Sequence, residues 1–368
     1  MRHASLRGIL LTLGSGAFVA LAAFAGACSS SGTGGSGTTG GTCPDNLVKA
    51  EHQEFCEGGA PAVNCDLVTG QYTDQICGVA LKTPEDELKR SATVKEYAGS
   101  GPPKISCFDP ASYPAKPDTA NSQKVQVSGI AKIFSHGCES KNLKIEIFTV
   151  KRGGGADDGM PDQLVGNALT TSSDCKVNGV ESEEMDCGKR YECNYIYNGV
   201  PTETELMIKT SGDLWASLYD YNVYIPNAEV MNGVYKHDVR ALASDDYNVI
   251  SQAAIGVPVT SGHGAIAGEV HDCGDVRLQN ATVEVDQQRK IMTYFTSDED
   301  HPLPDTAARA TSILGLYAAI DVNPGPVTVA AMGKVDGKNV TVGYFKLQVF
   351  PDSVSAVTFR GLRPFQVP

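Results

Sequence analysis

Two short motifs combine a histidine with a cysteine and could carry chemistry. In "HGCE", His136 and Glu139 have the H-x-x-E spacing with which some zinc peptidases hold their metal. The chain repeats the motif as "HDCG", which places Gly274 where the carboxylate would stand. The sequence contains no HExxH helix, no G-x-S-x-G elbow and no phosphate-binding loop. We therefore predict a protein that is not an enzyme and uses no cofactor, with a zinc-dependent peptidase or another hydrolase as the rival hypothesis.

Acidic loops offer a second kind of chemistry, because carboxylate oxygens bind calcium. The loops "GGGADDGMPD" and "SDEDHPLPD" supply Asp157, Asp158 and Asp162, and Asp298, Glu299, Asp300 and Asp305. Neither loop follows the ligand order of an EF-hand. We predict solvated loops without a metal, and calcium binding stays open as the alternative.

An aromatic strand is the candidate ligand platform. In "LWASLYDYNV", strand alternation separates three aromatic from three aliphatic side chains: Trp215, Tyr219 and Tyr221 on one face, and Leu214, Ala216 and Leu218 on the other. If the aliphatic face packs in the core, the rings point outward, where they could stack on a sugar or a peptide. The alternative is that residues 153–198 cover the rings as a second layer.

Eleven cysteines divide into one that we predict to carry lipid and ten that we predict to form disulfides. Arg2 and Arg7 precede an uncharged apolar run, and "AGA" leads into Cys28, the pattern of a secretory signal. A retained membrane helix is less favoured, because small residues follow the run where stop-transfer charges would be expected. "AGAC" resembles the bacterial lipoprotein box, although that box prefers Leu where this chain has Ala25.

Cysteine parity agrees with lipid at Cys28, because removing this residue leaves an even number suited to disulfides in an oxidising compartment. Zinc binding near Cys187 is less favoured, since the spacing lacks paired C-x-x-C motifs. The disulfide candidates are Cys43, Cys56, Cys65, Cys77, Cys107, Cys138, Cys175, Cys187, Cys193 and Cys273.

The first 42 residues predict where the protein works. Residues 1–27 are the lipoprotein signal peptide, and residues 28–42, rich in Gly, Ser and Thr, form a flexible tether. Ser29 stands where an inner-membrane retention signal would have Asp, so we expect the outer membrane or cell surface of a didermic bacterium. The membrane is then a partner through the N-terminal lipid. Nucleic acid is not an expected partner, because the formal net charge is −13.

Alternating hydrophobic residues predict that most of the chain forms β-strands. Residues 43–118 are rich in cysteine and contain one helix signal, "TPEDELKRS", with Thr83 as the cap. From residue 124, segments such as "KVQVSGIAKIF", "LKIEIFTV" and "YFKLQVF" carry β-branched residues at period two. Helical periodicity is nearly absent from this part of the chain, which favours β-sandwiches.

Two segments repeat each other at a constant offset. "GIAKIFSHGCESKNL" from Gly129 aligns with "GAIAGEVHDCGDVRL" from Gly264, and Cys138 falls on Cys273. Followed by "TSILGLYAAIDVNPGPVTVAAMG", the second segment resembles a carboxypeptidase regulatory-like domain. That resemblance implies a transthyretin-like, non-catalytic sandwich. The predicted fold class is all-β: two tandem transthyretin-like or Ig-like β-sandwiches preceded by a small disulfide-rich module.

The predicted domains follow from these segments. Residues 119–258 form the first sandwich, with an insertion at 153–198, and residues 259–368 form the second. Cys273 is alone in the second repeat, so it must bond outside that repeat and fix the domains relative to one another. The predicted function is a lipid-anchored cell-surface protein with a non-catalytic structural or ligand-binding role, the unknown ligand being a glycan or a peptide. A passive structural spacer in a surface assembly is the remaining alternative.

Overall fold

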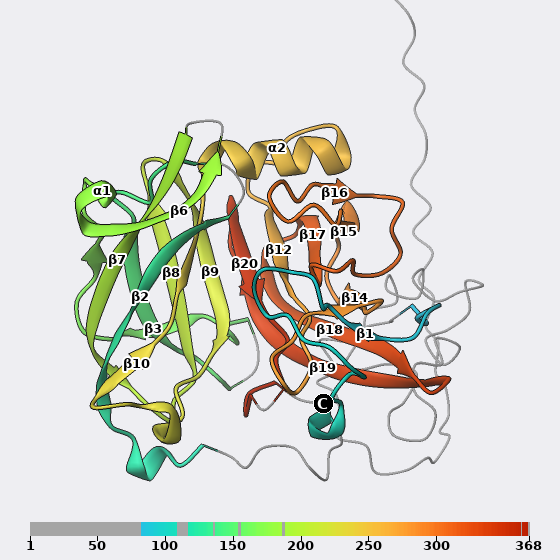
Figure 1. Ribbon diagram of the computed structural model, residues 1–368, viewed down its shortest axis with the longest axis horizontal. Helices are drawn as coiled ribbons and strands as arrows, with labels where there is room; N and C mark the ends of the chain where they lie inside the picture. Colours follow the sequence, from blue (N-terminus) through green and yellow to red (C-terminus); the bar gives the residue numbers. More distant parts are fainter. Residues whose placement is uncertain are drawn as a thin grey trace, which may run out of the picture. The chain divides into compact units, whose positions relative to one another are not determined.

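The computed structural model describes residues 82–108, 117–134, 137–153, 156–185, 188–361 and 363–366 (Figure 1). The predicted signal peptide and tether lie outside these residues, together with Cys28, Cys43, Cys56, Cys65, Cys77, Cys187 and His136. Within the described ranges, no helix has the length and apolar character needed to cross a membrane. Strands dominate these ranges, so the predicted all-β class is confirmed.

The first half of the described chain forms one layer of a sandwich in the order β10–β2–β7–β6, with β11 also beside β2. Its strands are β2 (Lys124–Phe134), β6 (Gly179–Met185), β7 (Gly188–Pro201), β10 (Val234–Lys236) and β11 (Val239–Leu242). The facing layer contains β3 (Lys144–Val150), β4 (Pro161–Leu164), β5 (Leu169–Thr170), β8 (Leu206–Gly212) and β9 (Trp215–Val223). Alternate residues of both layers, including Val127, Ile147 and Tyr197, fill the space between them.

The second half repeats this architecture. One layer contains β12 (Gly264–Glu269), β15 (Ile291–Phe295), β16 (Pro304–Asp305), β17 (Leu316–Val322) and β20 (Ser353–Val357). The facing layer has the order β14–β18–β19: β14 (Thr282–Val285), β18 (Gly325–Val335) and β19 (Lys338–Val349). Their shared core includes Ile266, Tyr317, Val329 and Phe345.

Strand order supports the internal repeat. In the first sandwich β2 lies between antiparallel β7 and the parallel strands β10 and β11. In the second sandwich β12 lies in the same way between antiparallel β17 and parallel β20. Gly129 of β2 and Gly264 of β12, which the sequence alignment superposes, therefore belong to equivalent strands.

A single ten-stranded sheet runs through both sandwiches, because β9 pairs in parallel with β20. The two partner layers cover opposite faces of this sheet. Ile208 of β8 belongs to the first core, whereas Tyr221 of β9 belongs to the second core and lies 6.2 Å from the ring of Phe345. The two sandwiches are thus joined edge to edge through backbone hydrogen bonds rather than through a linker (Figure 1).

The helix predicted to start at Thr83 is wrong. The segment is irregular up to β1 (Lys89–Arg90), which pairs with β13 (Leu278–Gln279) of the second sandwich. Leu88 explains the difference, because it is buried in the second core and its N–H donates to Lys334 O at 2.8 Å. Its side chain packs so closely on Gly333 that a Cβ at this glycine would clash. Tertiary packing therefore overrides the local helix signal.

The structure contains a helix that the sequence patterns did not predict, and part of the predicted insertion belongs to a central strand. Helix α2 (Ser244–Ile255) has acidic residues in its first turn and ends at Gly256, whose φ is 74°. Residues 153–198, predicted to be an insertion, include most of β7, a central strand of the first sandwich. Figure 1 shows α2 lying across the ends of strands from both sandwiches.

Candidate functional site

The parallel pair β9–β20 arranges side chains from both sandwiches in rows across one face of the long sheet. Asp220 lies opposite Ala356, followed by Ala267 on β12 and Ala318 on β17. The neighbouring row is apolar: Leu218, Val354, Ala265 and Ile320. Because three of the four residues in the Asp220 row are alanines, this row forms a channel across the strands with one carboxylate at its end.

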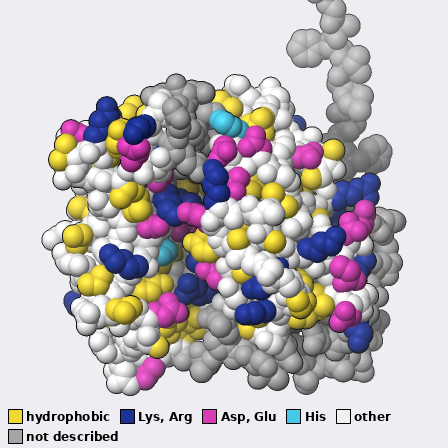
Figure 2. Space-filling view, in the orientation of Figure 1, with side chains coloured by type: hydrophobic (Ala, Val, Ile, Leu, Met, Phe, Trp, Pro, Cys, Tyr) yellow, Lys and Arg dark blue, Asp and Glu magenta, His cyan; other side chains and the backbone are white. Residues whose placement is uncertain are grey.

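This channel is the floor of a cavity of about 600 Å³, which we call the junction cavity. Its volume falls in the range of about 300 to 1,000 Å³ that is usual for small-molecule sites. Tyr247 and Ile250 of α2 cover its apolar end, where they pack near Leu242 of β11. The polar end is lined by Tyr97, His237, Asp238, Arg240 and Arg360. In Figure 2, basic and acidic side chains gather beside one another near the middle of the face shown.

Asp220 is the unpaired acid of the junction cavity. Burial raises the pKa of Asp220 to about 6, although the charges of Arg360 and Arg240 act to lower it. No residue in the described ranges makes a hydrogen bond or an ion pair with its carboxylate. The sequence signal for this residue is a lone acid inside an aromatic strand, "LYDYN", and our sequence analysis did not single it out.

Two further polar atoms on the cavity wall lack partners within the described part of the chain. His237 Nε2 and the Tyr247 hydroxyl are both buried without a hydrogen bond. Burial, together with the charges of Arg360 and Arg363, lowers the pKa of His237 to about 3, so its ring is neutral near pH 7. Buried polar atoms are usually hydrogen-bonded, so such atoms on a cavity wall mark places where a ligand can bind.

A chain of ion pairs encloses the polar end of the cavity. Lys132 of β2 binds Glu96 and Asp238, and its Nζ lies 3.1 Å from Asp238 Oδ2. Arg240 of β11 lies 3.6 Å from Glu96 and 3.6 Å from Glu269. Burial acts to lower the pKa of Lys132, but its hydrogen bond with Glu96 and the nearby carboxylates raise that pKa above the ordinary value. The pairs of Glu96 tie the N-terminal segment to the first sandwich, and the pair of Arg240 with Glu269 ties the first sandwich to the second.

His271 continues the ion-pair chain within the second sandwich. The ring is 0% exposed, with Nε2 2.8 Å from Glu269 Oε2 and Nδ1 2.7 Å from Asp275 Oδ1. Arg277 Nε also donates to Glu269 Oε2, at 3.1 Å. Burial acts to raise the pKa of Glu269, but the hydrogen bond with His271 and the charge of Arg277 hold it well below its ordinary value. The backbone N–H of His271 donates to Phe359 O at 2.8 Å, which fixes the backbone on which this ring is held.

Tyr97 packs over this chain of charges. Its ring centroid lies 4.9 Å from the guanidinium carbon of Arg360 and 4.8 Å from the ring of His271. Arg360 also donates to the Tyr97 hydroxyl at 3.2 Å and lies 3.4 Å from Asp275. The cation–π contacts hold the N-terminal segment against the second sandwich.

The described walls of the junction cavity offer no activated nucleophile. The hydroxyl of Ser251 donates to Asn248 O at 2.9 Å, and Cys273 is held in a disulfide with Cys107. Among the residues that the structure describes, no three His, Cys, Asp or Glu side chains are grouped to hold a metal ion. The described walls offer a carboxylate and two unpartnered polar atoms beside apolar rows, an arrangement that can bind a ligand noncovalently.

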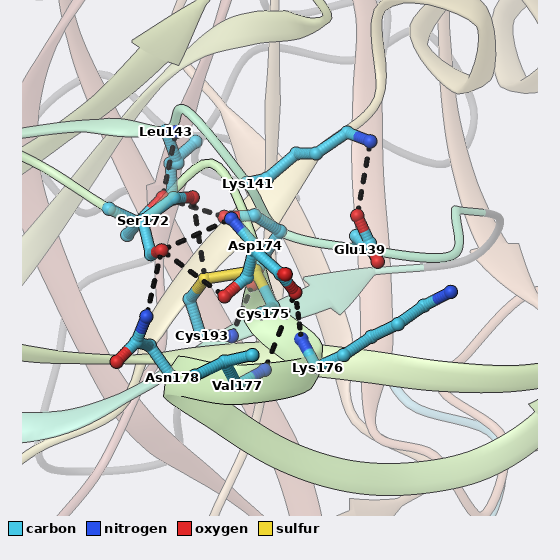
Figure 3. The surroundings of a disulfide bond; sticks show 12 residues. Glu139, Lys141, Leu143, Ser172, Asp174, Cys175, Lys176, Val177, Asn178 and Cys193 are labelled. Atoms are coloured by element: carbon cyan, nitrogen blue, oxygen red, sulfur yellow. Dashed lines mark hydrogen bonds and ion pairs between the residues drawn. A yellow bond between two sulfur atoms is a disulfide. The ribbon is translucent and has the colours of Figure 1, made fainter.

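Disulfides join distant parts of the chain as the cysteine pattern predicts. Cys107 bonds to Cys273 across a sequence separation of 166 residues, so the predicted link between the cysteine-rich segment and the second repeat is confirmed. Cys175 bonds to Cys193, next to the short helix α1 (Cys175–Asn178) that Asp174 caps (Figure 3). Cys138 is also disulfide-bonded.

The predicted aromatic platform is wrong for two of its three residues. Trp215 is 5% exposed and Tyr221 is 2% exposed. Trp215 Nε1 donates to Lys141 O at 3.0 Å inside the first sandwich, and the Tyr221 hydroxyl donates to Gly159 O at 2.7 Å. Tyr219 is partly buried and stacks on Phe350 with ring centroids 4.0 Å apart. The three rings do not share one face: Trp215 packs in the first core, whereas Tyr219 and Tyr221 pack against Phe350 and Phe345 of the second sandwich.

The residues of the metal hypotheses have partners within the protein. Glu139 forms an ion pair of 3.0 Å with Lys141, and Figure 3 shows the two side chains side by side. The acidic-loop residues Asp157, Asp158 and Asp300 form ion pairs with Lys151, Arg152 and Lys95. Asp298 and Asp305 accept hydrogen bonds from backbone N–H groups of their own loops.

Comparisons with known proteins leave the family open. No protein-family model and no curated protein matches this chain. The shaft pilin SpaA from Lactobacillus rhamnosus GG is similar in structure, with 9% identity, coverage of 65% of this chain and 98% of the pilin, and a TM-score of 0.18. The minor pilin GBS52 from Streptococcus agalactiae is similar with 10% identity, coverage of 64% and 94%, and a TM-score of 0.18. Such scores carry no functional argument, and the resemblance to carboxypeptidase regulatory-like domains stays a prediction.

Proposed function

We propose that this chain is a non-catalytic structural protein of the cell surface, held to the membrane by lipid on Cys28. Its two β-sandwiches act as one stiff body that stands on the tether of residues 28–42. The observation that carries the proposal is the parallel pairing of β9 with β20, which makes one sheet out of two sandwiches. Backbone hydrogen bonds across such a junction resist bending far better than a flexible linker does.

Three other features support stiffness. The Cys107–Cys273 disulfide, with Cα atoms 5.8 Å apart, ties the N-terminal segment to the second sandwich. The ion pairs of Glu96 with Lys132 and Arg240 tie the same segment to the first sandwich. Helix α2 packs on apolar side chains of both, through Ile250.

Cell fractionation tests the anchor. The wild-type chain should be found in the membrane fraction and should be cut by protease added to intact cells. The variant Cys28→Ala should be released into the soluble fraction, because it cannot accept lipid. Cys28→Ala that stays in the membrane, or a wild-type chain that is soluble, would contradict the proposal. Intact mass before and after reduction measures acylation and disulfide number in the same sample.

The zinc content of the purified protein distinguishes the structural proposal from the hypothesis of a zinc-dependent hydrolase. On that hypothesis, one zinc ion per chain should accompany the purified protein and be lost in His136→Ala or Glu139→Ala. On the structural proposal, wild type and both variants should show equal, substoichiometric zinc and equal thermal stability. Stoichiometric zinc that Glu139→Ala abolishes would favour the hydrolase.

A further inference from the structure

The acids of the junction cavity differ in whether they have a partner. Four of its carboxylates besides Asp220 line the wall. Asp238, Glu269 and Asp275 each contact a basic side chain, and Glu229 is exposed to solvent. Asp220 is half-buried and has no such partner within the described ranges. A carboxylate in an apolar channel is stabilised by any donor that a ligand brings, most of all by a cation.

The basic groups of the cavity are already engaged. Arg240 faces Glu96 and Glu269, and Arg360 faces Asp275. The remaining cations that line it, Lys132, Lys236 and Arg363, donate to Asp238, the Ser128 hydroxyl and Tyr224 O. A negatively charged ligand would compete with the carboxylates that pair with Lys132, Arg240 and Arg360, whereas a positively charged ligand meets in Asp220 a carboxylate with no partner in the described ranges.

The rest of the channel suits an apolar body. Beyond Asp220 the floor consists of Ala356, Ala267 and Ala318, with the larger apolar row of Leu218 and its neighbours alongside. The Tyr247 hydroxyl on α2 adds one hydrogen-bonding position over this floor. A site that combines apolar walls with a few unpaired polar groups is the usual form of a small-molecule pocket.

We propose that the junction cavity binds a small organic cation, in which an ammonium or guanidinium group pairs with Asp220 and an apolar body lies along the alanine row. His237 Nε2 accepts a hydrogen bond from the cationic group, and the Tyr247 hydroxyl lies over the apolar body of the ligand. The site is independent of the proposed structural function, because a stiff body needs no ligand.

Binding should depend on pH through Asp220. The charged groups that act on Asp220 come from three elements: Arg240 on β11, Arg360 after β20 and Glu269 on β12. Four neighbouring groups are shifted away from the range between pH 5.0 and 7.5: the pKa of His237 is lowered to about 3, that of Lys132 is raised, and those of Glu269 and Asp275 are lowered. With a pKa of about 6, Asp220 is mostly protonated at pH 5.0 and mostly ionised at pH 7.5.

Calorimetric titration of the full chain with matched probes tests the proposal. We expect 3-phenylpropylamine to bind at one site, at least about tenfold tighter than the neutral 3-phenylpropan-1-ol, with 3-phenylpropionate weaker still. The affinity for the amine should fall about tenfold between pH 7.5 and 5.0, because the ionised fraction of Asp220 falls by that factor. Saturable binding of the anion in preference to the amine would overturn the proposal, as would no binding of the amine.

Single substitutions test whether Asp220 and Tyr247 form the binding site. Asp220→Asn should weaken amine binding at least about tenfold and remove the pH dependence, and Tyr247→Phe should weaken it about threefold. Asp213→Asn is the matched control, since Asp213 is an exposed acid in the turn before β9. Equal binding by Asp220→Asn and wild type would refute the assignment. If that variant does not fold, the pH dependence of the wild type decides alone.

A further titration tests whether the cavity prefers a small free amine or the basic side chain of a peptide. The probe is the capped dipeptide acetyl-Phe-Lys-amide, which offers the same ammonium group on a bulkier body. We expect it to bind at least about fivefold more weakly than 3-phenylpropylamine, because α2 covers the apolar end of the cavity. Tighter binding of the dipeptide would overturn the small-molecule assignment.

Discussion

Asp220 lies directly opposite Ala356 across the parallel pair of strands that turns two sandwiches into one sheet. A carboxylate at this position is unusual, because a strand buried on both faces normally carries apolar residues. Burial raises the pKa of Asp220 to about 6 from an ordinary value of 3.8. Ionised Asp220 therefore lowers the stability of the folded protein.

Asp220→Asn should stabilise the protein at neutral pH. Since the folded pKa exceeds the unfolded value, ionisation favours unfolding: the penalty is absent below about pH 3.8, develops between pH 4 and 6, and is complete above pH 6. We expect the variant to gain about 2 kcal/mol of unfolding free energy at pH 7.5 and close to none at pH 4.0. Urea unfolding at the two pH values measures the difference. Asp213→Asn, the exposed control, should show no such pH dependence, and an Asp220→Asn gain that is equal at both pH values would contradict the explanation.

The longer disulfide should contribute more stability than the shorter one. Cys107–Cys273 spans 166 residues and Cys175–Cys193 spans 18, and chain entropy in the unfolded state grows with the length of the closed loop. The double variant Cys107→Ala/Cys273→Ala should lose about 5 kcal/mol, against about 3 kcal/mol for Cys175→Ala/Cys193→Ala. Denaturant midpoints of the two variants give the comparison. A larger loss in the second variant would show that strain or packing, and not loop length, sets the effect.

Cysteine counting and period-two patterns predicted much of the fold. The strands from Lys124 onward, the repeat that relates Gly129 to Gly264, and the external bond of Cys273 all follow from local sequence. Each of these depends on residue type and spacing alone, which is why a single sequence sufficed.

The candidate site could not be predicted, because it depends on which strand edges meet. The pattern of β9 predicts one core face and one outward face. Pairing with β20 instead brings the second sandwich against the outward face, where Tyr219 and Tyr221 contact Phe350 and Phe345. That pairing joins residues more than 130 positions apart, and the periodicity of a strand does not indicate which distant strand it pairs with. Asp220 therefore appeared as one acid in an aromatic strand rather than as the end of a cavity. The helix after Ser244 was missed although its stop signal, Gly256, is present in the sequence.

Glu269 should be the most important acid of the ion-pair chain. It accepts hydrogen bonds from His271 and Arg277, and these partners hold its pKa well below the ordinary value. Glu269→Gln removes the buried carboxylate that His271, Arg277 and Arg240 share and should cost about 3 kcal/mol. The matched change Glu139→Gln removes a more exposed pair with Lys141 and should cost less than about 1 kcal/mol.

The pH dependence of Glu269 has the opposite sign to that of Asp220. The pKa of Glu269 is lower in the folded than in the unfolded protein. Its contribution to the free energy of unfolding is therefore complete above the unfolded pKa near 4.5 and is lost as the pH falls through the folded value. The difference in stability between wild type and Glu269→Gln should therefore shrink below pH 4.5. A difference that grows on acidification would show that the carboxylate is protonated in the folded protein.

The stability cost of substituting Trp215 shows whether its ring belongs to the core or to an exposed ligand platform. It is 5% exposed and its indole N–H donates to Lys141 O, whereas the adjacent Leu214 is 60% exposed. Trp215→Ala should cost about 3 to 5 kcal/mol, because it removes a large buried side chain and leaves a cavity. Leu214→Ala, one position away, should change stability by less than about 0.5 kcal/mol. Thermal melting followed by far-ultraviolet circular dichroism suits both variants, since the chain has only one tryptophan as a fluorescent reporter. A stable, fully folded Trp215→Ala protein would restore the exposed aromatic platform that the burial of this ring argues against.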